Sequence, residues 1–169
     1  GHVRVYAWNG SAWIQRGSDI DGENNGDRLG DRTSTSLSSD GSILAIGAYA
    51  HDSNKGQVRV YAWDGSAWIQ RGNDLDGEAA NDQNGNAVSL SSDGSILAIG
   101  ASLHESSNGS NSGQVRVYAW NGSAWKQRGN DLDGEAADDQ SGNAVSLSSD
   151  GSILAIGALE HDSSKGHVR

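Results

Sequence analysis

Apolar residues along much of the chain recur at every second position, which is the spacing of a β-strand. In residues 58–63 (Val-Arg-Val-Tyr-Ala-Trp), valine and alanine face one side of such a strand, while arginine and the aromatic residues face the other. Asp64-Gly65 follows, a dipeptide that favours a hairpin because both residues can take positive φ. Residues 66–71 would then return antiparallel. The sequence predicts a hairpin that is aliphatic on one face and aromatic on the other.

The expected turn also fixes which residues of this hairpin pair. A two-residue turn at Asp64-Gly65 would place Val60 opposite Ile69 and Tyr61 opposite Trp68, so that each pair matches in character. Two alternatives remain for the aromatic residues. They either pack between neighbouring sheets, where they bury the most area, or stack sugars and other ligands.

Two more strands precede the hairpin. Residues 87–91 alternate between apolar and polar, and residues 96–101 (Ile-Leu-Ala-Ile-Gly-Ala) are apolar at consecutive positions. Such a run is typical of a strand that is covered on both faces. The connection Ser-Ser-Asp-Gly-Ser is short enough for a tight turn. Each unit is therefore expected to hold four antiparallel strands.

This unit recurs along the whole chain of 169 residues. The glycine before the Val-Arg-Val segment lies at Gly1, Gly56, Gly113 and Gly166, in steps of 55, 57 and 53 residues, and the longer steps reflect longer polar loops. A fixed period of this size indicates a repeat architecture. The expected fold is all-β: a β-propeller of four-stranded antiparallel blades of about 53 residues, with three blade equivalents in this chain.

The repeats divide the chain into four parts. Residues 1–32 are expected to supply the third and fourth strands of a split blade, and residues 33–72 a complete blade. Residues 73–129 form a second complete blade with the loop that leads into it. Residues 130–169 give the first two strands of another split blade and the start of its third. Three blades are too few to close a ring, so we expect closure by other copies of the chain or by further repeats of a longer chain.

Charge and composition exclude several partners. The chain has 22 acidic and 12 basic side chains, for a formal charge of −10. Nucleic-acid binding requires clustered basic residues, so we predict no nucleic-acid partner. No apolar stretch is long enough for a membrane span. Cysteine is absent, so no disulfide holds the fold.

An acidic loop, Asp-x-Asp-Gly-Glu, recurs once in each repeat. Its carboxylates are Asp19, Asp21 and Glu23, then Asp74, Asp76 and Glu78, then Asp131, Asp133 and Glu135. Carboxylates spaced around a glycine turn suit Ca²⁺, which takes oxygen ligands. The alternative is a solvated turn in which the aspartates cap backbone N–H groups. Calcium is the one cofactor that the sequence suggests.

Two other motifs recur in loops. A histidine stands beside a carboxylate in His51-Asp52, His104-Glu105 and His161-Asp162. With one histidine in each loop and no nucleophile nearby in sequence, we interpret these as surface pairs and predict no catalytic residue. Asn9, Asn108 and Asn121 each begin an Asn-Gly-Ser triplet, which fits the N-glycosylation pattern.

The run Ser-Leu-Ser-Ser-Asp-Gly-Ser-Ile-Leu-Ala-Ile-Gly-Ala, followed by Gly-x-Val-Arg-Val-Tyr, resembles the FG-GAP repeats that build the integrin α-subunit head. The resemblance covers nearly the whole chain and implies a propeller fold at the cell surface or outside the cell. That family often carries a calcium loop between the first two strands. Here the connection is Ser-Ser-Asp-Gly-Ser, with one carboxylate, so family calcium binding does not carry over to that position.

The resemblance and the near-identical units favour a noncatalytic extracellular or cell-surface scaffold or adhesion module that assembles by completing blades, with a protein or glycan ligand. The alternative is a carbohydrate- or ligand-binding propeller with one equivalent site per blade. An enzyme is disfavoured, because a catalytic site needs different groups in one place and these repeats supply the same groups everywhere.

Overall fold

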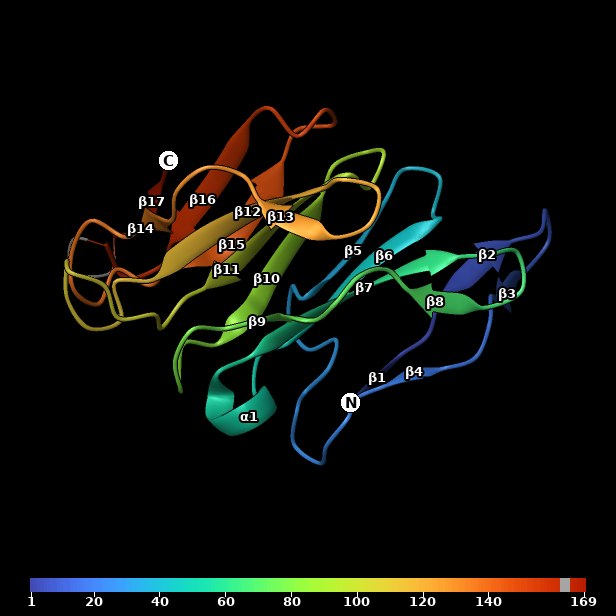
Figure 1. The fold of residues 1–169 in the computed structure, drawn as a ribbon, viewed down its shortest axis with the longest axis horizontal. Coiled ribbons are helices and arrows are strands. Elements are labelled where there is room, and N and C mark those ends of the chain that lie inside the picture. Colours follow the sequence, from blue (N-terminus) through green and yellow to red (C-terminus); the bar gives the residue numbers. More distant parts are fainter. Residues whose placement is uncertain (162–164) are drawn as a thin grey trace.

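The chain is an all-β protein in which several antiparallel sheets lie against one another. The computed structural model describes residues 1–161 and 165–169. The sheets follow one another in chain order across the molecule, from the N-terminal strands (blue) to the C-terminal strands (red) (Figure 1). The predicted all-β class and antiparallel pairing are confirmed. Within the described ranges, no helix has the length and apolar character needed to cross a bilayer.

The first four strands form two small antiparallel pairs, β1 with β4 and β2 with β3. Their bounds are β1 (His2–Val3), β2 (Tyr6–Trp8), β3 (Trp13–Gln15) and β4 (Ile20–Asp21). We call these four strands the N-terminal pairs. All three residues of β2 are exposed, and β3 is the one described strand that pairs with β2.

Two central sheets repeat one strand order. The first central sheet consists of β5 (Thr35–Leu37), β6 (Ile43–Ala48), β7 (Gln57–Trp63), β8 (Trp68–Gln70) and β9 (Leu75–Asp76). The second central sheet consists of β10 (Asn84–Leu90), β11 (Ile96–Ala101), β12 (Gln114–Trp120), β13 (Trp125–Gln127) and β14 (Leu132–Asp133). In both, the first four strands are hydrogen-bonded in chain order and the fifth pairs with the third.

A short turn, α1 (His51–Asn54), follows β6 and includes non-helical residues at positive φ, Asp52 and Ser53. The last strands are β15 (Ser141–Leu147), β16 (Leu154–Ala158) and β17 (His167–Val168), paired in that order, and we call them the C-terminal sheet. β17 pairs with Gly157 and Ala158 at the end of β16, and Arg169 continues the pairing to Ile156.

The hairpin register differs from the prediction. Trp63 pairs with Trp68 and Tyr61 with Gln70, so the connection has four residues, not two. Gly65 takes a positive φ of 105° and Asp64 does not. The Asp64 carboxylate instead accepts hydrogen bonds from the N–H groups of Ser66 (2.7 Å) and Ala67 (2.8 Å). Because the shift is two residues, each side chain keeps its predicted face.

The fifth strand of each central sheet was not predicted. Leu75 and Asp76 of β9 pair with Val58 and Gln57 at the start of β7, so the acidic loop leaves directly from a strand. This pairing holds the Asp76 backbone in a fixed place at the edge of the first central sheet.

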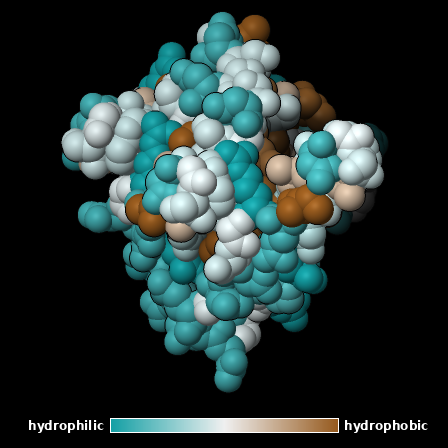
Figure 2. Space-filling model, turned by 90° about the vertical axis from the view of Figure 1, so that its right-hand side faces the viewer, coloured by the Kyte–Doolittle hydropathy of each residue, from teal (hydrophilic) through white to brown (hydrophobic). Residues whose placement is uncertain are grey.

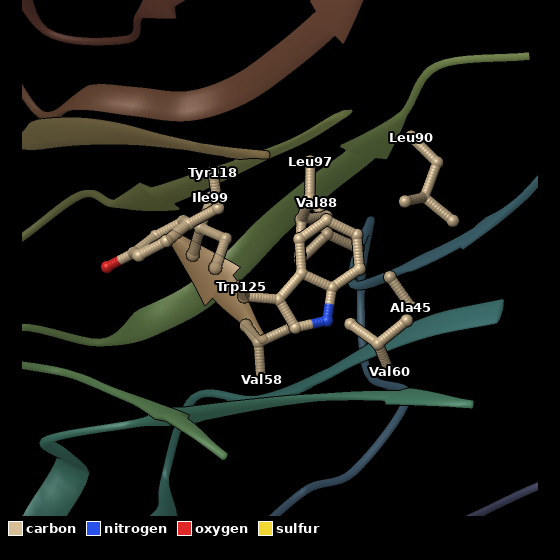
Figure 3. Packing of buried hydrophobic residues seen from close by; sticks show 9 residues of the cluster. All are labelled: Ala45, Val58, Val60, Val88, Leu90, Leu97, Ile99, Tyr118 and Trp125. Atoms are coloured by element: carbon tan, nitrogen blue, oxygen red, sulfur yellow. The ribbon is translucent and has the colours of Figure 1, made fainter. Parts of the chain in front are cut away.

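The two faces of the hairpin pack against different neighbours, as its pattern predicts. The aliphatic residues Ala45, Val58 and Val60 of the first central sheet meet Val88, Leu90, Leu97, Ile99, Tyr118 and Trp125 of the second central sheet in one buried cluster (Figure 3). On the opposite face, Tyr61 and Trp68 pack with Val5, which lies between β1 and β2, and with Ile20 of β4. Fully burying one such side chain stabilises the fold by about 1.5–3 kcal/mol.

A tryptophan contact joins each central sheet to the strands that precede it. The indole N–H of Trp68 donates to the Arg16 carbonyl (2.8 Å), and that of Trp125 donates to the Arg71 carbonyl (2.9 Å). Each ring lies beside the glycine that follows the arginine. A Cβ atom on Gly17 or Gly72 would lie about 3 Å from the rings, at 2.9 and 3.0 Å in both cases.

The serine turn between the first two strands of each unit also connects the sheets. The Ser39 N–H donates to the Ser92 carbonyl, and the Ser92 N–H donates to the Ser149 carbonyl, both at 2.8 Å. Within the turn, hydrogen bonds from the Ser38 hydroxyl and from Ser42 lower the pKa of Asp40 to about 2. The single carboxylate of this turn therefore caps local groups.

The tryptophan contact makes a prediction about stability. Trp125 is 7% exposed, whereas Trp13, its counterpart in β3, is 66% exposed. We expect Trp125→Ala to lower the free energy of unfolding by about 3–5 kcal/mol, as for other buried aromatic residues. Trp13→Ala should change it by less than about 0.5 kcal/mol. Urea denaturation of the monomeric chain measures both. Equal losses would contradict the packing described here.

Candidate functional site

The predicted acidic-loop residues lie beside the edges where neighbouring sheets meet. The first aspartate of each loop binds a glutamine amide of the strand before it. Gln15 donates to Asp19 (2.7 Å), Gln70 to Asp74 (2.6 Å) and Gln127 to Asp131 (2.6 Å). Each of these carboxylates thus links the loop to the end of the preceding strand.

The second aspartate of each loop contributes its backbone carbonyl. That of Asp21 accepts from the Arg59 guanidinium (2.8 Å), and that of Asp76 accepts from Arg116 (2.9 Å). The Arg116 guanidinium also donates to the Asn84 side chain (3.1 Å). Both arginines are buried and belong to the sheet that follows the loop. Each thus ties a sheet to the strand that precedes it.

The glutamate of each loop lies near the same arginine. Glu23 is 3.6 Å from Arg59, and Glu78 is 3.6 Å from Arg116. In the last repeat, Glu135 is 2.7 Å from Arg169, which also donates to the Asp133 carbonyl at 3.0 Å. The Arg169–Glu135 contact is a charge-assisted hydrogen bond, which is stronger than a neutral one, whereas the other two pairs are ion pairs beyond hydrogen-bond distance. The three glutamates are therefore engaged with arginine.

A further aspartate closes each loop. Asp27, Asp82 and Asp139 are buried, and each accepts a backbone N–H: from Asn24, Ala79 and Ala136 respectively, all at 2.8 Å. This is the turn-capping role that the sequence offered as the alternative to calcium binding. Here it belongs to the aspartate after the Asp-x-Asp-Gly-Glu motif.

The histidines face these buried aspartates. The Nδ1 atoms of His51, His104 and His161 lie 3.2, 3.1 and 3.0 Å from carboxylate oxygens of Asp27, Asp82 and Asp139. For His51 and His104, the expected surface pairs with the adjacent carboxylates are therefore not the contacts formed, and all three histidines are at most part-exposed. Asp162, the expected neighbour of His161, lies outside the described residues.

Electrostatics support this arrangement. Burial alone would raise the pKa of Asp27, but the Asn24 N–H and the neighbouring His51 outweigh it, so that pKa lies below its usual value. The same balance, with Ala136 and His161 as partners, lowers the pKa of Asp139. Both carboxylates are therefore ionised at neutral pH, and each can hold the loop and the histidine together.

The predicted glycosylation residues differ in their contacts. The side-chain oxygens of Asn9 and Asn121 accept from the N–H groups of Ser11 (2.9 Å) and Ser123 (3.0 Å) at exposed hairpin turns. The Asn108 amide group instead donates to the Gly134 carbonyl at 2.8 Å. Asn9 and Asn121 are thus the two whose amide nitrogen carries no described hydrogen bond.

The arginine of the Val-Arg-Val segment was not predicted from the sequence to be part of this site. The signal was available, since Arg59 is a charge between two valines in a strand expected to be covered on both faces. A buried guanidinium requires partners. Its partners are the Asp21 carbonyl, 38 residues earlier in the chain, and Glu23 of the same loop. Tertiary packing brings them together.

The arginine network makes the second prediction. Arg116→Ala leaves the Asp76 carbonyl and the buried Asn84 without their charged donor, so we expect a loss of about 2–3 kcal/mol in unfolding free energy. Arg4 holds the same repeat position but is exposed, so Arg4→Ala is the matched control and should cost less than about 0.5 kcal/mol. Denaturant melts of the monomer test this, and equal effects would argue against the network.

Calcium binding stays a prediction for these loops. Among residues 1–161 and 165–169, no three His, Asp or Glu side chains gather closely enough to hold a metal ion, so a glutamate would have to leave its arginine. If the loops bind Ca²⁺, calorimetry should show about one weak site per repeat, and EDTA should lower the melting temperature of a calcium-loaded sample. Glu78→Gln should remove one site. No heat and an unchanged melt would leave the carboxylates with the contacts described above.

No family model and no curated protein sequence matches this chain. Among solved structures, the chain is similar to TolB from Acinetobacter baumannii, with 16% sequence identity and a TM-score of 0.45. The similarity covers 83% of this chain and 29% of TolB. A likeness this remote does not distinguish one function from another.

Proposed function

We propose that the chain is a noncatalytic repeat scaffold or adhesion module of the FG-GAP-like propeller type, located at the cell surface or outside the cell. In this proposal each central sheet is one blade. The N-terminal pairs and the C-terminal sheet are two parts of split blades, and they assemble with further copies by completing each other.

The proposal rests on the contacts that the charged side chains make. The arginine, glutamate and histidine that could perform chemistry are engaged in the same contacts in successive repeats, as in the pairs of Arg59 with Glu23 and of Arg116 with Glu78. Each set connects one sheet to the next. A catalytic centre requires different groups that converge on one point, whereas these contacts serve the stacking of sheets.

Support for assembly comes from the two ends of the stack. Large apolar side chains whose counterparts in the central sheets are more covered are exposed there, among them Trp8, Trp13 and Ile153. Exposed apolar surface of this kind marks an interaction site in many soluble proteins. A repeat array needs such surfaces covered, either by capping or by further units.

The mass of the 169-residue chain in solution tests the proposal. Light scattering should give a discrete species at twice the 17.6 kDa chain mass, because two sets of three blade equivalents make a six-bladed ring, within the known range of about four to eight. A dilution series should show dissociation. A chain that remains monomeric at all concentrations would contradict assembly by blade completion.

A further inference from the structure

The two open ends of the stack are complementary in detail, and the geometry points to a second copy of this chain as the partner that covers them. This inference rests on the proposed function and names the contacts of that assembly. The N-terminal pairs of one copy lie beside β16 of the other and supply the third and fourth strands of its C-terminal sheet. The second copy also covers the tryptophan site that the second central sheet leaves open.

The first complementary feature is the tryptophan contact. Two such contacts are formed within the chain, at Gly17 and Gly72. The third glycine of the series, Gly129, has no described atom within 4 Å of the place a Cβ would take. The matching rings, Trp8 and Trp13, are exposed. The indole N–H of Trp13 from the second copy donates to the Arg128 carbonyl of the first copy. Trp68 and Trp125 donate in the same way to Arg16 and Arg71 within one chain.

The arginine before the glycine is already in position. Arg128 donates to the Gly151 carbonyl (3.3 Å), as Arg16 donates to Gly41 and Arg71 to Gly94, both at 3.0 Å. Arg16 and Arg71 each lie 4.7 Å from the centre of a tryptophan ring of the following sheet. Arg128 presents the same cation for Trp8 of the second copy, a favourable contact between a guanidinium and an aromatic face.

The second feature is the edge of β16. In the first central sheet, Leu44 and Ala45 pair with Tyr61 and Val60 of β7. Their counterparts Leu154 and Ala155 lack a described partner on that edge, because β17 pairs with Gly157 and Ala158 and the following Arg169 reaches no further than Ile156. An unpaired strand edge is a template for another strand. Tyr6 and Val5 of the second copy fit it in the register of the central sheets.

The third feature lies at the serine turns. A Cβ on Gly94 or Gly151 would be 2.7 Å from Ile43 or Ile96, the isoleucine of the preceding sheet. Gly41, the first glycine of this series, meets only an Arg16 nitrogen at 3.6 Å. Ile153, the last isoleucine, is 69% exposed. Ile153 of one copy therefore fits against Gly41 of the other.

One segment must move for this junction to form. Gly166–Arg169 has the same sequence as Gly1–Arg4, and it occupies the place beside β16 that the second copy would fill. Arg169 there contacts Glu135 and Asp133, as Arg59 and Arg116 do in their own sheets. Arg4 of the incoming copy replaces it and gains the same contacts, so the described hydrogen bonds of Arg169 to Glu135 and Asp133 are formed again after the exchange.

The partner is a second copy of this chain because the contacts missing at each open end are the ones that the chain forms between its own neighbouring sheets. Figure 2 views the molecule from the right-hand side of Figure 1, near β2 and β3, and shows hydrophobic atoms among hydrophilic ones. The junction repeats an interface that the chain already forms twice, including its polar contacts. It joins two different faces head to tail, so two copies close a ring or further copies extend a filament.

The test compares variants of the two faces by their dissociation constants, from light scattering and sedimentation equilibrium of the full chain. Trp13→Ala should weaken association roughly 30-fold or more, as expected for a central tryptophan. Ile14→Ala is the matched control, since Ile14 is 52% exposed and its counterpart Ile69 in the complete sheet is also 52% exposed. It should change affinity less than about threefold.

Gly129→Asn tests the opposite face, because asparagine tolerates positive φ and its side chain fills the tryptophan site. This variant should also associate weakly. An equimolar mixture of Trp13→Ala and Gly129→Asn should form 1:1 pairs, since one intact junction remains between an unaltered C-terminal sheet and unaltered N-terminal pairs. Circular dichroism and thermal melts confirm that each variant is folded.

Substitutions in the two identical segments, Gly1–Arg4 and Gly166–Arg169, should change the affinity of association in opposite directions. Arg4→Ala should weaken association, whereas Arg169→Ala loosens the segment that must leave and should strengthen it. If the wild-type chain associates but these variants and the tryptophan and glycine variants do not change its affinity, the inference is wrong while the proposed assembly stands. If the wild-type chain is monomeric at all concentrations, the proposed assembly fails, and the inference with it.

Discussion

Each inner sheet of this protein is apolar on both faces, and the rest of the structure depends on covering both. The strand β7 illustrates the constraint, because Val58 and Val60 face the following sheet while Tyr61 faces the preceding strands. A sheet with two apolar faces cannot be stable alone in water. It requires a neighbour on each side, and near-identical units provide that neighbour by repetition.

Polar contacts give the stack its register. Apolar burial is non-directional, so valine and leucine side chains alone would allow neighbouring sheets to slide. The Arg116 guanidinium and the Trp125 indole each have a single backbone carbonyl as acceptor in the preceding sheet, at 2.9 Å. Because an unpaired buried donor is costly, these contacts select one relative position. These buried polar groups thus fix the relative position of neighbouring sheets.

The sequence predicted the strands and their faces well, because a period of two is a local property that needs no knowledge of neighbours. It predicted the hairpin register less well. The choice between a two-residue and a four-residue turn depended on the Asp64 carboxylate, which caps Ser66 and Ala67. The candidate site was predicted in part. The acidic loops were found, but their partners Arg59 and His51 come from other elements, and only the fold shows which carboxylate each one meets.

The near-identity of the repeats has a consequence for how the chain reaches its native state. β7 and β12 have the same seven residues, Gln-Val-Arg-Val-Tyr-Ala-Trp. Either could therefore pair with β6 as the third strand of the sheet that contains β6. The correct choice rests on proximity along the chain, since closing a short loop costs less entropy than closing a long one. Folding therefore competes with strand exchange between repeats, the characteristic failure of tandem arrays. The loop from β6 to β7 favours the correct choice through its short length, which is a kinetic role in addition to the contact of His51 with Asp27.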